Sequence, residues 1–116
     1  MGLMFNHVHI KTPDVAATRK FYEDNYGATF KAEMNGGVQL DLHGTQINIT
    51  IIQPTQNHVQ YHGIEHLALT TDDYPGTMAK LRANGVTVLE ELVSNGRRVA
   101  FLESPDKAQM EIIERI

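Results

Sequence analysis

The chain has 116 residues, enough for one ordinary globular domain with its own core. It contains no cysteine, which excludes disulfides, iron–sulfur clusters and thiolate zinc sites, so any metal must be bound by nitrogen and oxygen ligands. The formal net charge of −4 and the scattered basic residues argue against a nucleic-acid partner, and no apolar run approaches the length of a membrane span.

The first half of the chain is predicted to form a strand, a helix and three further strands. Residues 4–12 alternate between apolar and polar, as in a strand. Thr12 is the expected N-cap of the helix, with Pro13 at its first position, and Gly27 is the expected stop. The next three strands are expected at 29–34, 38–42 and 46–52, with turns at 35–37 and 43–45 between them.

The same order of elements returns after a polar stretch. Residues 53–62 contain Pro54 and have no period, so they are interpreted as a linker. A strand at 63–70 and a helix capped by Asp72 or Asp73 follow, and Tyr74, Met78 and Leu81 form the apolar stripe of this helix. The helix is expected to end at Asn84-Gly85, and the last strands are predicted at 86–91, 98–103 and 109–114.

The two halves of the sequence correspond through a shift of 59 residues. This shift places His7 on His66, Asp14 on Asp73 and Asn25 on Asn84. The pattern predicts an α+β fold in which one domain, residues 1–116, contains two βαβββ modules, 4–52 and 63–114, joined by the linker 53–62.

Polar side chains are predicted to share the strand faces that point away from the helices. Because side chains alternate along a strand, the aliphatic rows of the strands pack on the helices and the polar residues point to the opposite face. The polar residues on that face are His7, His9, Asn48, Thr50, His66 and Glu111. His7, His66 and Glu111 are therefore a candidate metal site, although single histidines on sheets are more often hydrogen-bonded or solvated. His43, His58 and His62 lie in a turn or the linker and are expected to be exposed.

The motifs that carry a family resemblance lie in three segments. They are Phe5-Asn6-His7-Val8-His9-Ile10 with Pro13-Asp14-Val15, Gly63-Ile64-Glu65-His66-Leu67-Ala68-Leu69, and Phe101-Leu102-Glu103 running to Met110-Glu111-Ile112. Together the segments resemble the vicinal oxygen chelate superfamily, which includes glyoxalase I, extradiol dioxygenases, fosfomycin-resistance transferases and bleomycin-resistance proteins.

The resemblance implies a cupped, mostly antiparallel sheet with the helices on its outer face, and a homodimer. It also implies that His7, His66 and Glu111 bind one divalent metal ion, either Fe, Mn, Ni, Co or Zn. The position of the family's fourth ligand matches Asn48, a poorer ligand, with Thr50 as the next candidate.

The resemblance implies an enzyme that chelates a small substrate through neighbouring oxygens, as a glyoxalase-like lyase or isomerase or as an extradiol-type dioxygenase. His9 is the candidate general base. Two alternative roles for His9 are a polar residue that lines a substrate cleft on this face and a metal ligand in place of His7. Asn48, Thr50 and Arg98 are candidate substrate-binding residues, Arg98 for an anionic group.

Two further functions compete with an enzyme. One is a non-catalytic module that binds an antibiotic, as in the bleomycin-resistance type, and the other is a degenerate scaffold without a substrate. The expected partners are a small molecule and a second copy of the chain, with no nucleic acid and no membrane. A cytoplasmic location is expected because the N-terminus lacks the charged start and apolar stretch of a signal peptide.

Overall fold

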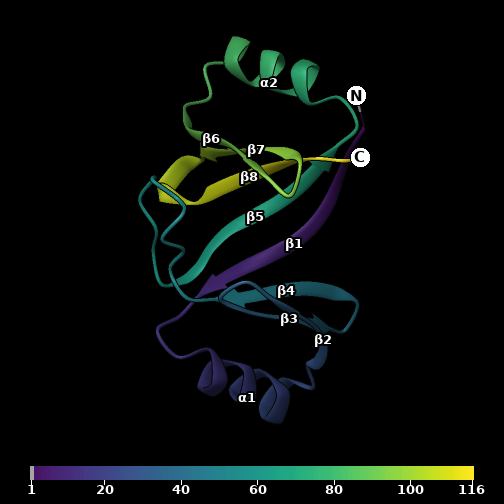
Figure 1. The fold of residues 1–116 in the computed structure, drawn as a ribbon, viewed down its shortest axis with the longest axis vertical. Coiled ribbons are helices and arrows are strands. Elements are labelled where there is room, and N and C mark those ends of the chain that lie inside the picture. The colour runs from purple at the N-terminus through teal and green to yellow at the C-terminus, as the bar shows by residue number, and fades with distance from the viewer. Residues whose placement is uncertain (1) are drawn as a thin grey trace. The chain divides into compact units, whose positions relative to one another are not determined.

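The computed structural model describes residues 2–116, which form two helices and an eight-stranded mixed sheet (Figure 1). The helices are α1 (Val15–Tyr26) and α2 (Tyr74–Ala83), and a short 3-10 helix spans Pro105–Lys107. The strands are β1 (Leu3–Lys11), β2 (Thr29–Met34), β3 (Gly37–Leu42), β4 (Thr45–Thr50), β5 (Gly63–Thr71), β6 (Val88–Ser94), β7 (Arg97–Glu103) and β8 (Gln109–Glu114). The predicted α+β class and the order βαβββ-βαβββ are confirmed.

The strands are hydrogen-bonded in the order β2-β3-β4-β1-β5-β8-β7-β6. The chain separates into two compact units. The α1 unit is His7–Glu65, and the α2 unit is His66–Ile116 with the described residues up to Asn6. In each unit one pair of strands is parallel, β1 with β4 and β5 with β8, and the hairpins are antiparallel.

Helix α1 begins two residues later than predicted, at Val15. Asp14 is the N-cap, because its carboxylate accepts from the backbone N–H of Ala17 at 3.0 Å. Thr12 is not the cap, and Pro13 precedes the helix rather than opening it. The Thr12 hydroxyl accepts from the backbone N–H of Asp14 at 3.2 Å and bonds the hydroxyl of Thr18 at 2.8 Å. Thr12 therefore braces the cap instead of forming it.

Helix α2 begins with the same set of hydrogen bonds, 59 residues later. Asp73 is the N-cap and accepts from the backbone N–H of Gly76 at 3.0 Å. Thr71 accepts from the backbone N–H of Asp73 at 3.1 Å and bonds the hydroxyl of Thr77 at 2.7 Å. The internal repeat is therefore visible in local structure as well as in sequence.

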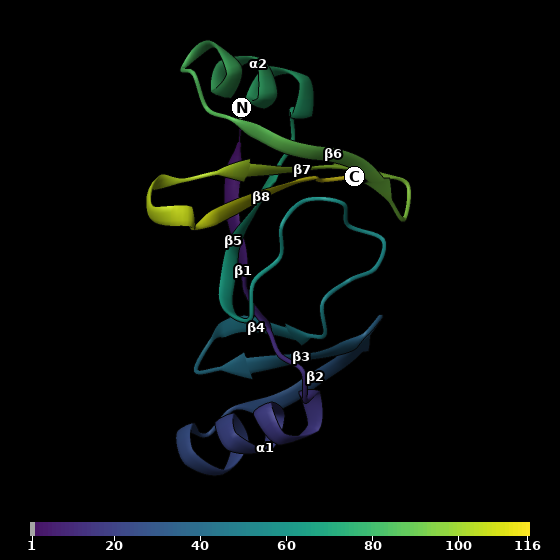
Figure 2. The same ribbon diagram turned by 90° about the vertical axis from the view of Figure 1, so that its left-hand side faces the viewer.

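The core of the α1 unit lies between α1 and one face of β3 and β4 (Figures 1 and 2). Its buried members are Ile10, Ala28, Val38, Leu40, Ile47 and Ile49, with Val15, Tyr22 and Leu42 packed against them. The predicted aliphatic row of β4 is confirmed for Ile47 and Ile49, but β4 ends at Thr50 and Ile51 is exposed. Residues 51–62 leave the end of β4 as a long loop that leads to β5 (Figure 2).

The core of the α2 unit has the same plan. Tyr74, Met78, Ala100, Leu102 and Ile112 are buried, and Leu69, Leu81, Val86 and Val88 pack against them, which confirms the predicted apolar stripe of α2. Alternation places Leu67 and Leu69 of β5 on the helix face, but Leu67 is 41% exposed and only Leu69 packs on this core. Strand β6 begins at Val88 rather than Val86, because Val86 belongs to the turn that leaves α2.

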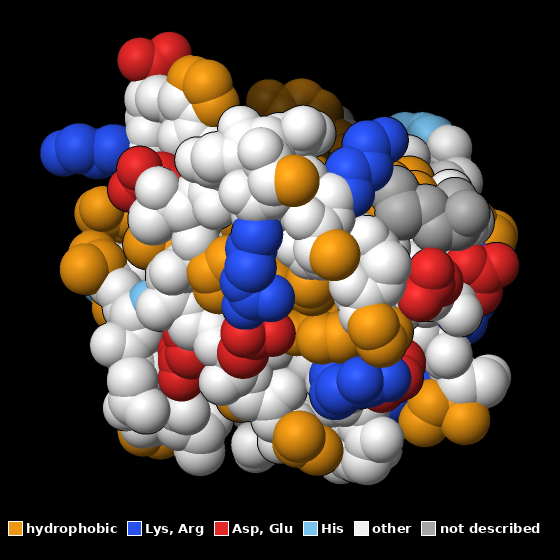
Figure 3. Space-filling view, turned by 90° about the horizontal axis from the view of Figure 1, so that it is seen from above, with side chains coloured by type: hydrophobic (Ala, Val, Ile, Leu, Met, Phe, Trp, Pro, Cys, Tyr) orange, Lys and Arg blue, Asp and Glu red, His pale blue; other side chains and the backbone are white. Residues whose placement is uncertain are grey.

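The outer surface of the α2 unit carries both signs of charge. In Figure 3, which views the α2 unit from the side of α2, acidic and basic side chains lie beside each other rather than in patches of one sign. Arg82, for example, forms an ion pair with Glu91. Within residues 2–116, neither helix is long and apolar enough to pass through a lipid bilayer.

Candidate metal-binding site

In the α1 unit, β1 places a row of buried polar side chains on the face away from α1. His7, His9 and Lys11 alternate with the aliphatic residues of the strand, and all three are buried. The ring centroids of His7 and His9 lie 5.7 Å apart. In the parallel pair β1–β4, His9 lies opposite Asn48 and Lys11 opposite Thr50. The predicted polar face of β1 and β4 is therefore present in this unit.

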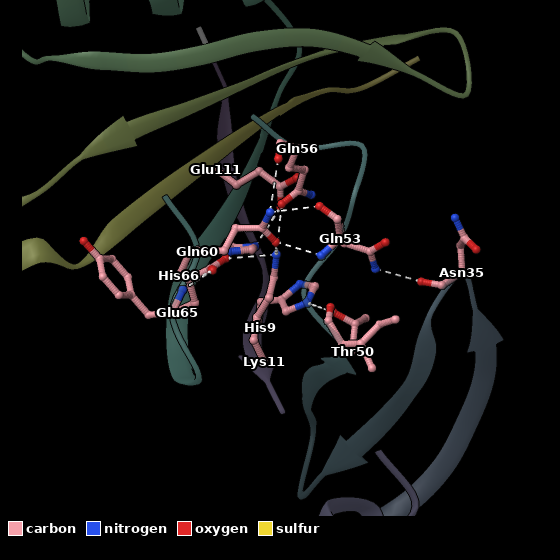
Figure 4. Close-up of polar contacts among 12 residues, drawn as sticks. His9, Lys11, Asn35, Thr50, Gln53, Gln56, Gln60, Glu65, His66 and Glu111 are labelled. Carbon is pink, nitrogen blue, oxygen red and sulfur yellow. Dashed lines mark hydrogen bonds and ion pairs between the residues drawn. The ribbon is translucent and has the colours of Figure 1, made fainter. Parts of the chain in front are cut away.

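The hydrogen bonds of Thr50 determine the tautomer of His9. The Nε2 atom of His9 lies 2.7 Å from the Thr50 hydroxyl (Figure 4), and that hydroxyl donates to the backbone carbonyl of Ile51 at 2.8 Å. A hydroxyl has one hydrogen, so Thr50 must accept the second bond from His9. Nε2 of His9 therefore carries the hydrogen, and Nδ1 is the nitrogen with a lone pair in the neutral ring.

Asn48 is buried beside His9 and is held by its own strand. Its Oδ1 atom accepts a hydrogen bond from Nε2 of Gln46 at 2.9 Å. This oxygen is the better metal ligand of the two polar atoms of an amide side chain, and Gln46 competes for it. Asn48 is thus on the polar face, but the oxygen that would bind a metal already accepts a hydrogen bond from Gln46.

Lys11 is a buried residue of the polar face that the sequence interpretation missed. Its ammonium group donates to Oε1 of Gln56 at 2.9 Å and to Oε1 of Gln60, and forms a fully buried ion pair with Glu65 at 3.4 Å (Figure 4). Gln60 also accepts from the backbone N–H of Gln53 at 2.8 Å. Residues 53–62, expected to be a simple linker, are therefore folded around a buried lysine. The alternation of His7, His9 and Lys11 was the available signal.

In the α2 unit, His66 and Glu111 meet on the face away from α2. Nε2 of His66 lies 3.2 Å from Oε1 of Glu111, and both side chains are largely buried. The ring of Phe101 stands edge-on to His66, with centroids 5.5 Å apart. Because Ala100, Leu102 and Ile112 fill the opposite face, the alternation of β7 and β8 accounts for this pairing.

Arg98 lies elsewhere in the same unit. Its backbone N–H and Nε both donate to Oε1 of Glu114, at 3.0 and 3.1 Å, and its guanidinium group stacks over the ring of Tyr74 at 5.0 Å. Tyr74 belongs to the core beneath α2, so Arg98 is on the helix side and not beside His66 and Glu111. A contact of Arg98 with substrate remains a prediction.

The strand registers relate Asn48 to Glu111. His9 lies opposite Asn48 in the pair β1–β4, and Ala68 lies opposite Glu111 in the pair β5–β8. The 59-residue shift of the repeat relates His9 to position 68, so Asn48 occupies in the first module the position that Glu111 occupies in the second. The repeat therefore places an amide in one module and a carboxylate in the other.

The donor groups on these faces suit a divalent metal ion. His7 and His9 of the α1 unit and His66 of the α2 unit are buried imidazoles, and Glu111 adds a carboxylate oxygen. Neutral imidazole and carboxylate are ligands for zinc, iron, manganese, nickel and cobalt. The residues present thus fit such an ion in chemical type.

Comparison with known proteins assigns the chain to a family. The family model Glyoxalase/Bleomycin resistance protein/Dioxygenase superfamily matches residues 4–112. Among solved structures, a hypothetical protein from Bacillus halodurans C-125 is 18% identical with a TM-score of 0.76, covering 100% of this chain and 96% of its own. Methylmalonyl-CoA epimerase from Mycobacterium tuberculosis is 20% identical with a TM-score of 0.72, covering 97% and 87%.

A third structure is more similar in sequence. A variant of methylmalonyl-CoA epimerase from Streptomyces coelicolor, in complex with 2-nitronate-propionyl-CoA, is 25% identical with a TM-score of 0.63 and covers 96% of this chain and 93% of its own. The first two likenesses show the fold, and the family model spans nearly the whole chain. The chain therefore belongs to the glyoxalase/bleomycin resistance protein/dioxygenase superfamily.

Proposed function

We propose that this chain is a divalent-metal-dependent enzyme acting on a small substrate that chelates the ion through two neighbouring oxygens. His7, His66 and Glu111 are the proposed protein ligands. Members of this superfamily typically bind a divalent metal ion and small molecules, which supports the proposal. A bound ion would supply Lewis-acid stabilisation of negative charge on a substrate oxygen.

The observation that carries the proposal is the pairing of His66 with Glu111 on a largely buried polar face. A buried imidazole and a carboxylate in contact already place one nitrogen ligand and one oxygen ligand side by side. His7 is the repeat equivalent of His66, and β1 and β5, which carry the two histidines, are neighbours in the strand order. These relations support one ion for all three residues.

We infer proton transfer at a carbon next to a carbonyl as the reaction class, as in an isomerase or lyase. Two epimerase structures that are 25% identical, one of them in complex with methylmalonyl-CoA and NH4+, support this class. The competing class is an extradiol-type dioxygenase. The 4-hydroxymandelate synthase among the structural neighbours is 18% identical, and the match covers 49% of that chain, so it shows the fold alone.

Solvent deuterium exchange tests the reaction class. Protein loaded with Co²⁺, Zn²⁺, Ni²⁺ or Mn²⁺ is incubated in deuterated water with methylmalonyl-CoA or with the hemithioacetal of methylglyoxal and glutathione. Deuterium uptake at the carbon next to the carbonyl, lost in His66→Ala and kept in His62→Ala, is the expected result. Oxygen consumption with a catechol and Fe²⁺, without deuterium uptake, would instead assign a dioxygenase.

A non-catalytic binding module is the second candidate function. Asn48 favours it, because an amide held by Gln46 replaces the carboxylate that the repeat has at Glu111. Calorimetric titration of metal-free protein with bleomycin tests it. Tight binding without metal, together with no deuterium uptake and no oxygen consumption, would favour this function over the enzyme.

We propose that the protein is a homodimer, as the family resemblance implies. Leu3, Met4 and Phe5 of β1 are each about half exposed, and a second chain would remove this apolar surface from water. Sedimentation velocity is expected to give twice the mass of the chain. A single monomeric species at micromolar concentration would contradict the dimer.

A further inference from the structure

We propose that His9 is an additional ligand of this metal ion, bound through Nδ1, and that Thr50 is the residue that holds it in the binding tautomer. This inference rests on the proposed function, because it adds a ligand to the same ion. It gives the first module a second metal ligand beside His7, as Glu111 is the second ligand beside His66 in the second module.

The asymmetry between the two modules points to His9. In the second module, β8 supplies Glu111 and the residue opposite it on β5 is Ala68, which has no donor atom. In the first module, β4 has Asn48 at the matching position, and the residue opposite it on β1 is His9. In the second module the side chain that can bind a metal is therefore on β8, whereas in the first module it is on β1, the strand facing β4.

The position of His9 on its strand suits ligation of the same ion as His7. The two residues are two positions apart, so their side chains leave β1 on one face. Their ligand atoms lie within 4.8 Å of each other, and both rings are buried. Two imidazoles that leave one strand face this close together can approach a single ion from the same side.

Thr50 supplies the support that a metal-binding histidine needs. Such a histidine commonly donates its second ring N–H to an acceptor, which fixes the tautomer and the ring orientation. The Thr50 hydroxyl is that acceptor for Nε2 of His9, because its own hydrogen is donated to the carbonyl of Ile51. Nδ1 is then the ligand atom.

The second module shows that the pair is a specific feature of the first. Lys11 lies opposite Thr50, and Thr70 lies opposite Ile113, so Ile113 is the repeat equivalent of Thr50. Where the second module has Ala68 and Ile113, the first has a histidine and its hydrogen-bond acceptor. Both members of the pair differ together, as expected if they act together.

Nuclear magnetic resonance of ¹⁵N-histidine-labelled protein tests the proposal directly. Two-bond nitrogen–proton correlations identify which nitrogen of each ring carries hydrogen and which binds zinc. Metal-free wild type is expected to show His9 protonated at Nε2. On titration with Zn²⁺, Nδ1 of His9 is expected to shift to a metal-bound frequency together with one nitrogen each of His7 and His66.

Zinc affinities of variants, measured by competition with a chelating dye, give a second readout. His9→Ala is expected to lower the affinity at least about tenfold, and Thr50→Val about 10- to 100-fold, the range for losing a partner of a metal-binding histidine. Thr50→Ser keeps the acceptor and is expected to restore the wild-type affinity. His62→Ala removes an exposed imidazole from the loop and is the matched control, with no change.

Four outcomes overturn the proposal. If Zn²⁺ shifts only His7 and His66, or if His9 is protonated at Nδ1, His9 is not the ligand but the proposed function stands. If Asn48→Ala lowers the affinity and His9→Ala does not, the fourth ligand is on β4. If wild-type protein binds neither Zn²⁺ nor Fe²⁺, Mn²⁺, Ni²⁺ or Co²⁺, this inference and the metal-dependent function fail together. The wild-type spectra show whether His9 binds Zn²⁺ even if a variant does not fold.

Discussion

Replacing the buried Lys11 with methionine tests the account of the loop that follows β4. The Lys11 ammonium group contacts Glu65, Gln56 and Gln60, and its side chain and that of Glu65 are fully buried. Lys11→Met fills a similar volume but leaves the Glu65 carboxylate buried without its cation. Breaking a buried pair in this way costs about 3–5 kcal/mol of unfolding free energy.

The double variant Lys11→Met/Glu65→Gln separates the pair from simple packing. The double variant has no buried charge without a partner. Its loss of unfolding free energy should therefore be smaller than the sum of the losses of Lys11→Met and Glu65→Gln, by about 2 kcal/mol or more. Urea unfolding followed by far-ultraviolet circular dichroism measures all four proteins, and hydrogen exchange should show faster exchange in 53–62 for Lys11→Met. Additive losses, or a single loss below about 1 kcal/mol, would refute the reasoning.

Three further predictions concern the scaffold. Asp73→Ala removes the N-cap of α2 and should lower the unfolding free energy by about 1 kcal/mol in urea titration. Gly37→Ala would place a Cβ atom 1.8 Å from the carbonyl oxygen of Ile49 and should destabilise more than Gly96→Ala, which costs about 1–2 kcal/mol for its positive φ in open space. Hydrogen bonds from the side chain and backbone of Arg98 lower the pKa of Glu114 from 4.5 to about 2. The ionised carboxylate therefore stabilises the fold above pH 4.5, and this contribution is lost as the pH falls toward 2. Arg98→Met should raise the pKa of Glu114 toward 4.5 in a carbon-13 carboxyl titration, and an unchanged pKa would contradict the contact.

Much of the fold follows from local patterns that the sequence displays. The 59-residue repeat and the alternation of strands predict the two modules and the polar faces, because both signals depend on neighbouring residues. The start of α1 was misplaced because Thr12 and Asp14 are both good caps. In the structure the Thr12 hydroxyl bonds the hydroxyl of Thr18, and the carboxylate of Asp14 caps the helix.

The site was less predictable, since its contacts join residues far apart in the chain. Thr50 lies 41 positions from His9, and Gln60 lies 49 positions from Lys11. No local period relates such pairs, so alternation could place His9 on the polar face but could not identify its hydrogen-bond partner or its tautomer. The equivalence of Asn48 and Glu111 likewise depends on strand registers, which the sequence does not show.

Metal content is the most direct test of the central claim that His7, His66 and Glu111 bind a divalent ion. The protein is purified without a histidine tag and without chelators, and metals are measured by mass spectrometry in wild type, His66→Ala and the control His62→Ala. The account predicts about one transition-metal ion per chain in wild type and in His62→Ala, as expected for one site per chain, and loss of the ion in His66→Ala. Wild type that holds no metal even after soaking, or a His66→Ala variant that keeps its metal, would contradict it.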